Sequence, residues 1–370
     1  MLETAVCPEC GVPKPFTEDN VWLNSGAMVQ ASDETRRVGF IESENLDPVY
    51  KGIEEIIGVP INRLVINVIR KGTLDYIRNI TLPKIQEIIK SAEGAGNNIA
   101  DFLMANGQVC GFGKYETIGI EYKSANEGYT TVRLTDPFSV LLSAGIHAGS
   151  CEAILYLPHE VTYKEVSPGV YETTAYVSKH PEELEERLMM RLYRRKEGDI
   201  ELERCATCGG PKALSSFKWD LEKGKIFNTL NSRRMVLIGP EAQDPLFEEL
   251  ERELGDEIPA AVIEAQRRFI KTGGYSIEEM VNAGDFRTQL ALRGLGNLRK
   301  VDMSSKSLRV RIDNAAGYLL IVGMAQALFE TAVDVESNVE WEISKDSDLD
   351  VEVTPRKTSY AILMEGSSPS

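Results

Sequence analysis

The stretch CPECGVPK at residues 7–14 returns as CATCGGPK at residues 205–212. In both stretches two Cys are separated by two residues, Gly follows the second Cys, and Pro-Lys ends the phrase at the same distance. Each Cys of the first stretch precedes its counterpart by 198 positions (205 − 7 and 208 − 10). We call these two stretches the cysteine knuckles, and their recurrence predicts an internal repeat.

Matches continue downstream of the knuckles at a nearly constant offset of 197, which falls to 184 and then 178 where the second copy is shorter. The matched pairs are Trp22 and Trp219, Arg36-Arg37 and Arg233-Arg234, Asp47-Pro48 and Asp244-Pro245, Gly58 and Gly255, Arg70 and Arg267, Asp101 and Asp285, GFG at 111–113 and GLG at 294–296, Gly145 and Gly323, and Glu152 and Glu330. Such a run predicts a duplication with units of about 200 residues.

The expected domain organisation follows from the repeat. The first unit spans 1–179 and the second spans 205–354. Between them, residues 180–204 have a helical charge pattern with few breakers, so we expect a solvated linker helix. The tail at 355–370 contains GSSPS and is expected to fray.

Each unit has the same expected order of elements. The knuckle is followed by a short extended stretch, and then by a helix that begins at Asp-Pro, with Asp as its cap, and ends at Gly. A second helix, the GxG turn, strand-like runs, a helix carrying Gly145 or Gly323, and two further β-patterned segments come next. The sequence therefore predicts an α+β fold of two pseudo-symmetric repeats, each a knuckle followed by an α+β domain.

Composition narrows the class of protein. The 370 residues are 42% hydrophobic and carry a net charge of −16, so the surface repels phosphate backbones and nucleic-acid binding is disfavoured. The six residues before Cys7 are too short and acidic for a secretory signal. Since no apolar run approaches the roughly 18 residues that a membrane span needs, we expect a cytoplasmic protein, in which disulfides are rare.

The knuckles predict a metal site. A Cys-x-x-Cys-Gly turn points both sulfurs at one ion, but a closed tetrahedral zinc site needs four ligands and each knuckle supplies two. The simplest completion shares one zinc among Cys7, Cys10, Cys205 and Cys208, which would fasten the two repeats together.

Three other interpretations of these cysteines stay open. The four sulfurs can hold iron, as in a rubredoxin-like electron carrier. Each pair can be a redox dithiol, although Pro13 and Pro211 argue against the helix that usually follows such a motif. The four can also be buried thiols without metal. Cys110 and Cys151 stand alone and are expected to be packing residues.

Signals for catalysis are weak. No G-x-S-x-G, P-loop or H-E-x-x-H motif is present, and the three His at 147, 159 and 180 have no repeat partners. The Arg pairs are expected to form structural ion pairs. Glu152 and Glu330 form a matched acidic pair on apolar helices, and they are candidates for a polar contact inside a pocket. The protein is therefore expected to have no catalysis of its own.

The later part of each unit, about residues 45–178 and 242–354, resembles the 4-vinyl-reductase-type domain, also called a predicted hydrocarbon-binding domain. The resemblance rests on eight residues: Gly111, Gly113, Gly145, Glu152, Gly294, Gly296, Gly323 and Glu330. Many family members place metal-binding cysteines around the late helix, where this chain has only Cys151 and, in the second copy, Phe329. The family's own zinc site is thus expected to be absent, with the knuckles in its structural role.

The resemblance implies an apolar pocket for an aromatic, hydrocarbon or tetrapyrrole ligand. Candidate lining residues are Phe102, Phe112, Phe138 and Tyr156 in the first unit, and Phe286, Leu295, Tyr318 and Phe329 in the second. We therefore expect a zinc-clasped binding or accessory protein, whose partners are a hydrophobic small molecule and an enzyme that handles it. The alternatives are an enzyme subunit acting on that ligand and the iron-containing electron carrier.

Overall fold

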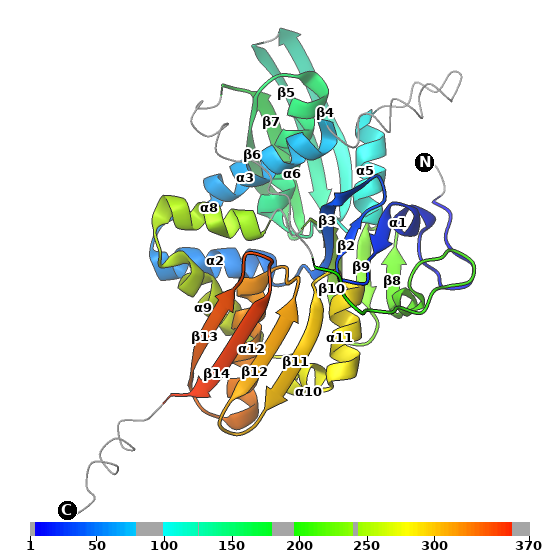
Figure 1. Ribbon diagram of the computed structural model, residues 1–370. Helices are drawn as coiled ribbons and strands as arrows, with labels where there is room; N and C mark the ends of the chain where they lie inside the picture. Colours follow the sequence, from blue (N-terminus) through cyan, green and yellow to red (C-terminus); the bar gives the residue numbers. More distant parts are fainter. Residues whose placement is uncertain (1–3, 79–98, 125, 180–195, 240–242, 357–370) are drawn as a thin grey trace, which may run out of the picture.

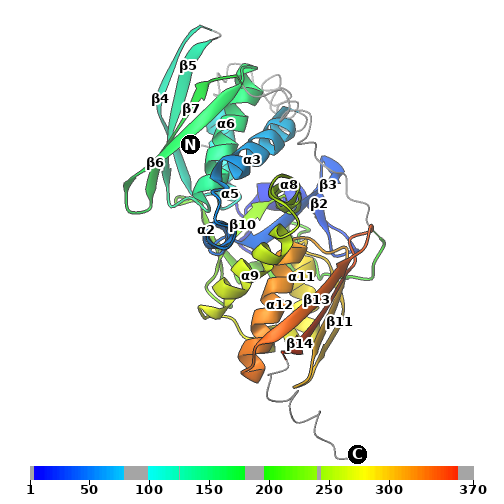
Figure 2. The same ribbon diagram turned by 90° about the vertical axis from the view of Figure 1, so that its left-hand side faces the viewer.

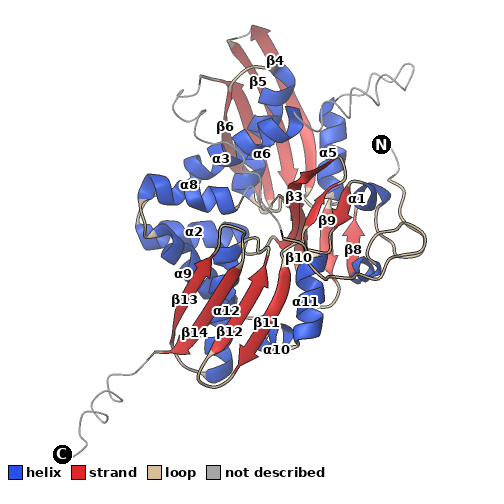
Figure 3. Cartoon of the chain, in the orientation of Figure 1, coloured by secondary structure: helices blue, strands red, loops and turns tan. Residues whose placement is uncertain are grey.

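The computed structural model describes residues 4–78, 99–124, 126–179, 196–239 and 243–356. The fold is mixed α+β, with helices packed on three antiparallel sheets (Figures 1 and 3). Two four-stranded sheets lie at opposite ends of the molecule, and a six-stranded sheet lies between them (Figures 1 and 2).

The first four-stranded sheet has the order β4-β5-β7-β6. Its strands are β4 (Lys114–Ser124), β5 (Glu127–Thr135), β6 (His159–Ser167) and β7 (Val170–Val177). One face of this sheet is covered by α6 (Val140–Leu155), which also packs against α3 (Asn62–Tyr76), and α5 (Ile99–Val109) lies beside β4. We call these elements the first module.

The second four-stranded sheet has the equivalent order β11-β12-β14-β13. Its strands are β11 (Asn297–Met303), β12 (Leu308–Asp313), β13 (Ser337–Ile343) and β14 (Leu349–Pro355). Here α12 (Tyr318–Val333) covers the sheet and packs against α9 (Ile258–Lys271), while α11 (Ala283–Leu292) lies beside β11. These elements form the second module.

The central sheet combines strands from both knuckle regions in the order β1-β2-β3-β10-β9-β8. Its strands are β1 (Asn20–Trp22), β2 (Met28–Gln30), β3 (Asp33–Glu42), β8 (Phe217–Asp220), β9 (Lys225–Asn228) and β10 (Arg234–Ile238). β3 and β10 are antiparallel neighbours, with Glu42 opposite Met235 and Gly39 opposite Ile238. Backbone hydrogen bonds therefore join the two knuckle regions into one sheet.

The remaining helices complete the structure: α1 (Lys14–Glu18), α2 (Leu46–Ile57), a 3₁₀ turn (Lys212–Ser216), α8 (Asp244–Leu254) and α10 (Ile277–Val281). α2 packs against α9 so closely that a Cβ on Gly52 would lie 2.9 Å from the Ala265 Cβ. No described helix combines the length and the apolar character that a membrane crossing requires.

The Asp-Pro pairs do not cap their own helices as the sequence suggested. Asp47 is the second residue of α2, and its carboxylate accepts hydrogen bonds from the Val140 backbone N at 3.0 Å and from the Ser139 hydroxyl. Asp244 accepts from the Gly317 backbone N at 3.0 Å. Each carboxylate therefore binds the N-terminus of the long helix in its module, where orphan N–H groups and the helix dipole favour a negative charge.

Glycine allows the long helices to approach their neighbours. A Cβ on Gly145 of α6 would lie 2.8 Å from the Ile66 carbonyl oxygen of α3, and one on Gly323 of α12 would lie 2.5 Å from the Ile263 carbonyl oxygen of α9. Real Cβ atoms do not tolerate such distances, so only Gly permits this packing at either position.

The knuckle strands dock crosswise, each on the module that follows the other knuckle. The Trp22 indole N–H donates to the Leu292 carbonyl of the second module at 2.8 Å, and the Trp219 N–H donates to the Val109 carbonyl of the first module at 3.1 Å. No sequence pattern indicated this exchange.

The second Arg of each pair follows the same crossed pattern. Arg37 donates to the carbonyls of Gly294 (2.8 Å) and Asn314, while Arg234 donates to the Asp136 carbonyl (2.7 Å). The GxG turns are thus docking points for the opposite knuckle region, where an Arg fork satisfies backbone carbonyls.

Two sequence expectations fall partly outside the described residues. Of the predicted linker helix at 180–204, residues 180–195 lie outside the described part, and residues 196–204 are not helical. The tail at 357–370 also lies outside it, and β14 extends to Pro355.

Candidate metal centre and ligand cavities

Both knuckles form the same tight turn. The Gly11 N–H donates to the Cys7 carbonyl at 2.9 Å, and the Gly209 N–H donates to the Cys205 carbonyl at 2.9 Å. Both Gly have a left-handed backbone, with φ of 73° and 72°, which Gly adopts at little cost. The turn therefore presents both sulfurs of a knuckle on one side.

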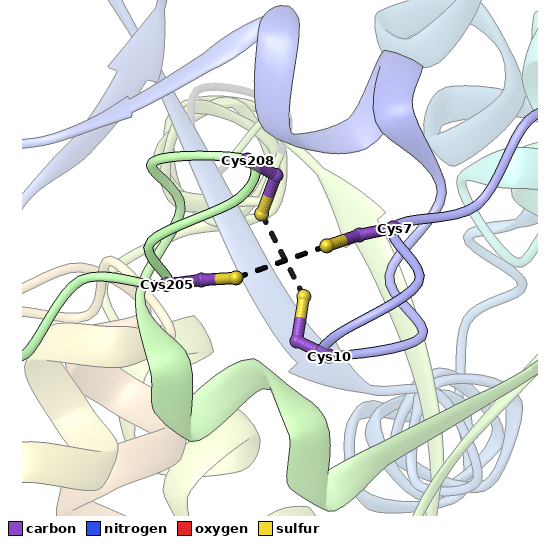
Figure 4. A group of neighbouring side chains, drawn as sticks. All are labelled: Cys7, Cys10, Cys205 and Cys208. Atoms are coloured by element: carbon purple, nitrogen blue, oxygen red, sulfur yellow. Dashed lines mark hydrogen bonds between the residues drawn. The ribbon is translucent and has the colours of Figure 1, made fainter.

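The structure brings the four sequence-predicted cysteines together, with their sulfurs pointing at a common centre (Figure 4). The Cys7 and Cys205 sulfurs are 3.7 Å apart, those of Cys10 and Cys208 are 3.6 Å apart, and all four lie within 4.8 Å of one another. A tetrahedral zinc site with bonds of about 2.3 Å has sulfur–sulfur edges of about 3.8 Å. A disulfide needs about 2.05 Å. The geometry therefore suits four thiolate ligands of one metal ion.

The protein environment steadies this centre. The Glu9 carboxylate of one knuckle accepts from the Thr207 backbone N at 3.1 Å and from its hydroxyl at 2.7 Å, which ties the two turns together.

Hydrogen bonding to the Cys10 backbone N–H lowers the pKa of the Cys7 thiol to about 7. Burial raises the pKa of the Cys10 thiol to about 12, and a cation among the sulfurs would favour its thiolate form.

A cavity of about 410 Å³ lies in the first module. α3, α5, β4, β5 and α6 contribute mostly apolar side chains to its wall, among them Ile69, Leu103, Phe112, Val132 and Ile146. Strand residues of the central sheet, such as Val38 and Leu237, close the wall from the side. We call this the first cavity; its size and lining are those of a small-molecule site.

A few polar side chains interrupt that apolar wall. Tyr122, Thr130, His147 and Cys151 all line the first cavity. The Tyr122 hydroxyl lies 3.0 Å from Thr130 Oγ1 and 3.0 Å from Nε2 of His159, which is fully buried behind it. Burial raises the pKa of the Cys151 thiol to about 11, so it is protonated at neutral pH.

The second cavity, of about 680 Å³, has a different character. It lies beside α9, α11 and α12, and polar groups line much of it. Glu42 accepts from the Tyr275 hydroxyl at 2.8 Å and pairs with Arg233 and Arg293 at 3.4 Å. The Arg233 guanidinium also stacks 3.5 Å above the Tyr275 ring, and burial raises the pKa of that phenol.

The predicted pocket residues are divided between wall and core. Phe112 lines the first cavity, and Phe286 and Leu295 line the second. The others do not line either cavity: Phe138 packs on Phe112 with ring centroids 4.8 Å apart, Phe102 is half-buried on α5, Tyr318 packs on Trp341, Phe329 is fully buried, and Tyr156 is exposed at the end of α6.

Each member of the matched acidic pair makes ion pairs and a backbone contact inside its own module and does not face a cavity. Glu152 pairs with buried Arg70 at 2.7 Å and accepts from the His159 backbone N at 2.8 Å. Glu330 pairs with Arg267 and Lys271, each at 2.8 Å, and accepts in the same way from the Ser337 backbone N.

His147 is the site residue that the sequence analysis left without a role. It has no repeat partner, because Ala325 stands at the matched position. A signal was nevertheless present, since His147 and Cys151 are four residues apart on one apolar helix and therefore share a face.

Comparison with known proteins adds little. No protein-family model matches the chain, and no curated protein matches it significantly. Among solved structures, an Fe(II) unliganded H-NOX protein from K. algicida is 10% identical, covers 33% of this chain and 76% of that chain, and has a TM-score of 0.26. A mutant H-NOX protein from T. Tengcongensis is 15% identical with the same two coverages and a TM-score of 0.24. Scores this low carry no argument about function.

Proposed function

We propose that the protein binds a hydrophobic small molecule in the first cavity, has no catalysis of its own, and is clasped by one structural zinc. The observation that carries the proposal is the apolar cavity of about 410 Å³ between α6 and its neighbours. The cysteine centre supports it by fixing the central sheet, whose strands help to close that cavity.

We also propose that the chain is a duplication of a knuckle and a 4-vinyl-reductase-type domain. Equal strand orders, helix-capping carboxylates at Asp47 and Asp244, and Arg–Glu pairs of Glu152 and Glu330 support the duplication. The family resemblance suggests an aromatic, hydrocarbon or tetrapyrrole ligand, and an enzyme handling that ligand as the partner.

Ligand binding is tested by calorimetric titration with naphthalene, using one cavity-filling variant for each cavity. Leu103→Trp fills the first cavity and is expected to abolish binding. Leu320→Trp fills the second cavity and is expected to leave the affinity unchanged. Binding that survives Leu103→Trp and is lost in Leu320→Trp would move the site to the second module, and no binding by the parent protein would overturn the proposal.

The metal is tested by elemental analysis and an absorption spectrum of protein purified without added metal. We expect one zinc per chain and no visible band, and a parallel loss of zinc in Cys205→Ser. Two zinc ions per chain would show that each knuckle finds other ligands.

An electron carrier is the second candidate, because four sulfurs at 3.6 and 3.7 Å across the centre also suit iron. One iron per chain with a visible thiolate-to-iron band would favour it. An enzyme subunit gains no support from the matched acidic pair, since Glu152 and Glu330 are each engaged by cations and a backbone N–H of their own module.

A further inference from the structure

Two histidines lie near the first cavity, and a hydrogen bond at Nδ1 holds each ring in place. For His159, Nδ1 lies 2.7 Å from the Leu157 carbonyl oxygen. A carbonyl only accepts, so Nδ1 carries the hydrogen and Nε2 carries the lone pair. The Tyr122 hydroxyl, 3.0 Å away, therefore donates to Nε2 and satisfies this ring.

For His147, Nδ1 lies 2.8 Å from the Thr173 hydroxyl oxygen, which also lies 3.4 Å from the Val132 carbonyl oxygen. When the hydroxyl donates to Val132, it accepts from Nδ1–H and Nε2 of His147 carries a lone pair; when it donates to Nδ1, Nε2 carries the hydrogen. An alcohol hydroxyl can complete either tautomer, because it both donates and accepts. Burial, followed by the neighbouring His159, lowers the pKa of His147 to about 3, so the ring is neutral at physiological pH.

Nε2 of His147 has no hydrogen-bond partner among the described residues, although the side chain is only 8% exposed and lines the first cavity. A buried ring nitrogen without a hydrogen-bond partner costs free energy comparable to a lost hydrogen bond. His159 shows how this protein satisfies such an atom, with a hydroxyl group, but no protein hydroxyl does so for His147.

Gln30 Oε1 is a second unpartnered atom in the wall. The Gln30 amide N–H donates to the Tyr76 hydroxyl at 2.8 Å, and turning the amide by 180° exchanges the unpartnered oxygen for an unpartnered NH2 group. Gln30 lies on β2 of the central sheet, whereas His147 lies on α6 of the first module.

We propose that the first cavity takes an apolar molecule bearing a hydroxyl group, an aromatic or aliphatic alcohol, whose hydroxyl forms a hydrogen bond with Nε2 of His147. This inference rests on the proposed function, and it names the ligand class and the residue that selects it. The apolar wall receives the hydrocarbon body, while the unpartnered Nε2 of His147 distinguishes an alcohol from the parent hydrocarbon. With Ala325 at the matched position, the second module offers no equivalent ring nitrogen from α12.

The test compares 1-naphthol with naphthalene by calorimetric titration of the full chain at neutral pH. The readout is the ratio of the two dissociation constants. His147→Asn keeps a donor near Thr173 and removes the Nε2 atom, while His147→Gln places an amide oxygen within reach of the Nε2 position. Leu320→Trp, which closes the second cavity, serves as the control.

We expect the preference for 1-naphthol to fall about tenfold in His147→Asn, the value of one hydrogen bond to a buried ring nitrogen, while naphthalene binds as before. His147→Gln is expected to restore part of the preference, and Leu320→Trp to leave it unchanged.

An unchanged preference in His147→Asn would overturn the inference and leave the proposed function standing, provided that naphthalene binds. If neither compound binds, both fail. Hemin that gives a Soret band in the parent protein and none in His147→Asn would also overturn the inference, since Nε2 would then be an iron ligand.

Discussion

In the first module α6 places His147 and Cys151 in the wall of the first cavity, whereas α12 of the second module has Ala325 and Phe329 at the matched positions. Phe329 is fully buried in the core, so the second helix fills space where the first one borders a cavity. The second cavity lies elsewhere along α12 and is lined by an Arg–Glu–Tyr network.

The contacts that the modules share are those that hold the backbone. Asp47 and Asp244 bind helix N-termini, Gly145 and Gly323 allow close helix packing, and Glu152 and Glu330 each bind a cation and a backbone N–H. Side chains that only line a cavity differ between modules. The comparison teaches that one backbone arrangement can be kept by a few polar contacts while the cavity beside it differs.

The largest expected effect is on the proposed metal centre, to which each knuckle contributes two cysteines. Because Cys10 and Cys208 face each other across the centre at 3.6 Å, Cys10→Ser and Cys208→Ser are expected to release the metal equally. Each should cost about 5 kcal/mol or more of unfolding free energy, as loss of a structural metal does. Elemental analysis and denaturant unfolding measure both effects.

Cys110→Ser is the control for this pair, since Cys110 lies outside the four-cysteine group and should keep the metal bound. If one knuckle variant lost the metal and the other retained it, the centre would not be a symmetric clasp.

The next-largest expected effect is a difference in stability between variants of the two ion pairs, Arg70–Glu152 and Arg267–Glu330. Arg70 and Glu152 are both almost fully buried and 2.7 Å apart, so Arg70→Met removes a buried cation from the Glu152 carboxylate and is expected to cost about 3–5 kcal/mol. Arg267→Met is expected to cost less than half of that, because Lys271 still pairs with Glu330 at 2.8 Å. Urea unfolding of both variants measures the difference.

Glu152→Gln combined with Arg70→Met should recover part of the lost stability, since it removes the buried charge. Equal costs for the two Arg variants would mean that Lys271 does not compensate in the second module.

Several helices and the cysteine group could be predicted from the sequence, because both depend on local patterns. Asp-Pro starts, Gly ends and hydrophobic periodicity predicted α2, α8 and α9 near their observed bounds. The Cys-x-x-Cys-Gly repeat predicted four converging sulfurs without any knowledge of the fold.

The docking of each knuckle region on the opposite module could not be predicted from the sequence, because it depends on long-range contacts that no local pattern indicates. Trp22 and Trp219 were recognised as a matched pair, but nothing in their neighbours shows that each binds the opposite module. Glu152 and Glu330 became candidate site residues because they match between the two halves of the sequence, whereas His147 has no match and was missed. Comparing the two halves of the sequence finds the residues that they share, so it misses a residue that lines one cavity only.

A smaller effect tests helix packing in the two modules. Gly145→Ala and Gly323→Ala add a methyl group that meets a backbone carbonyl, and each is expected to destabilise by about 1–3 kcal/mol. Gly323→Ala should cost more, because its Cβ would approach the carbonyl to 2.5 Å rather than 2.8 Å. Thermal unfolding measures both.

Gly72→Ala on α3 is the matched control, since its Cβ would meet no atom within 4 Å. It should stabilise the helix by about 0.5–1 kcal/mol through the ordinary preference for Ala. Stabilisation by all three substitutions would show that α6 and α12 pack less closely than the structure indicates.

The smallest effect is a pH dependence confined to the first module. The pKa of His147 is about 3 in the folded protein and about 6.5 when the chain is unfolded. Below pH 6.5 the unfolded chain binds a proton that the folded protein refuses, so this group lowers stability as the pH falls from about 6.5 towards 3. At pH 5.5 the penalty is about 1.4 kcal/mol relative to neutral pH.

His147→Asn removes this penalty, whereas Gln326→Ala on α12 of the second module should leave it unchanged. The expected result in urea unfolding is therefore a loss between pH 7.5 and 5.5 that is about 1.4 kcal/mol smaller in His147→Asn than in the parent protein. Parallel losses would mean that the imidazole reaches water or a donor in the folded state, and the unpartnered Nε2 would then no longer distinguish the first cavity from the second.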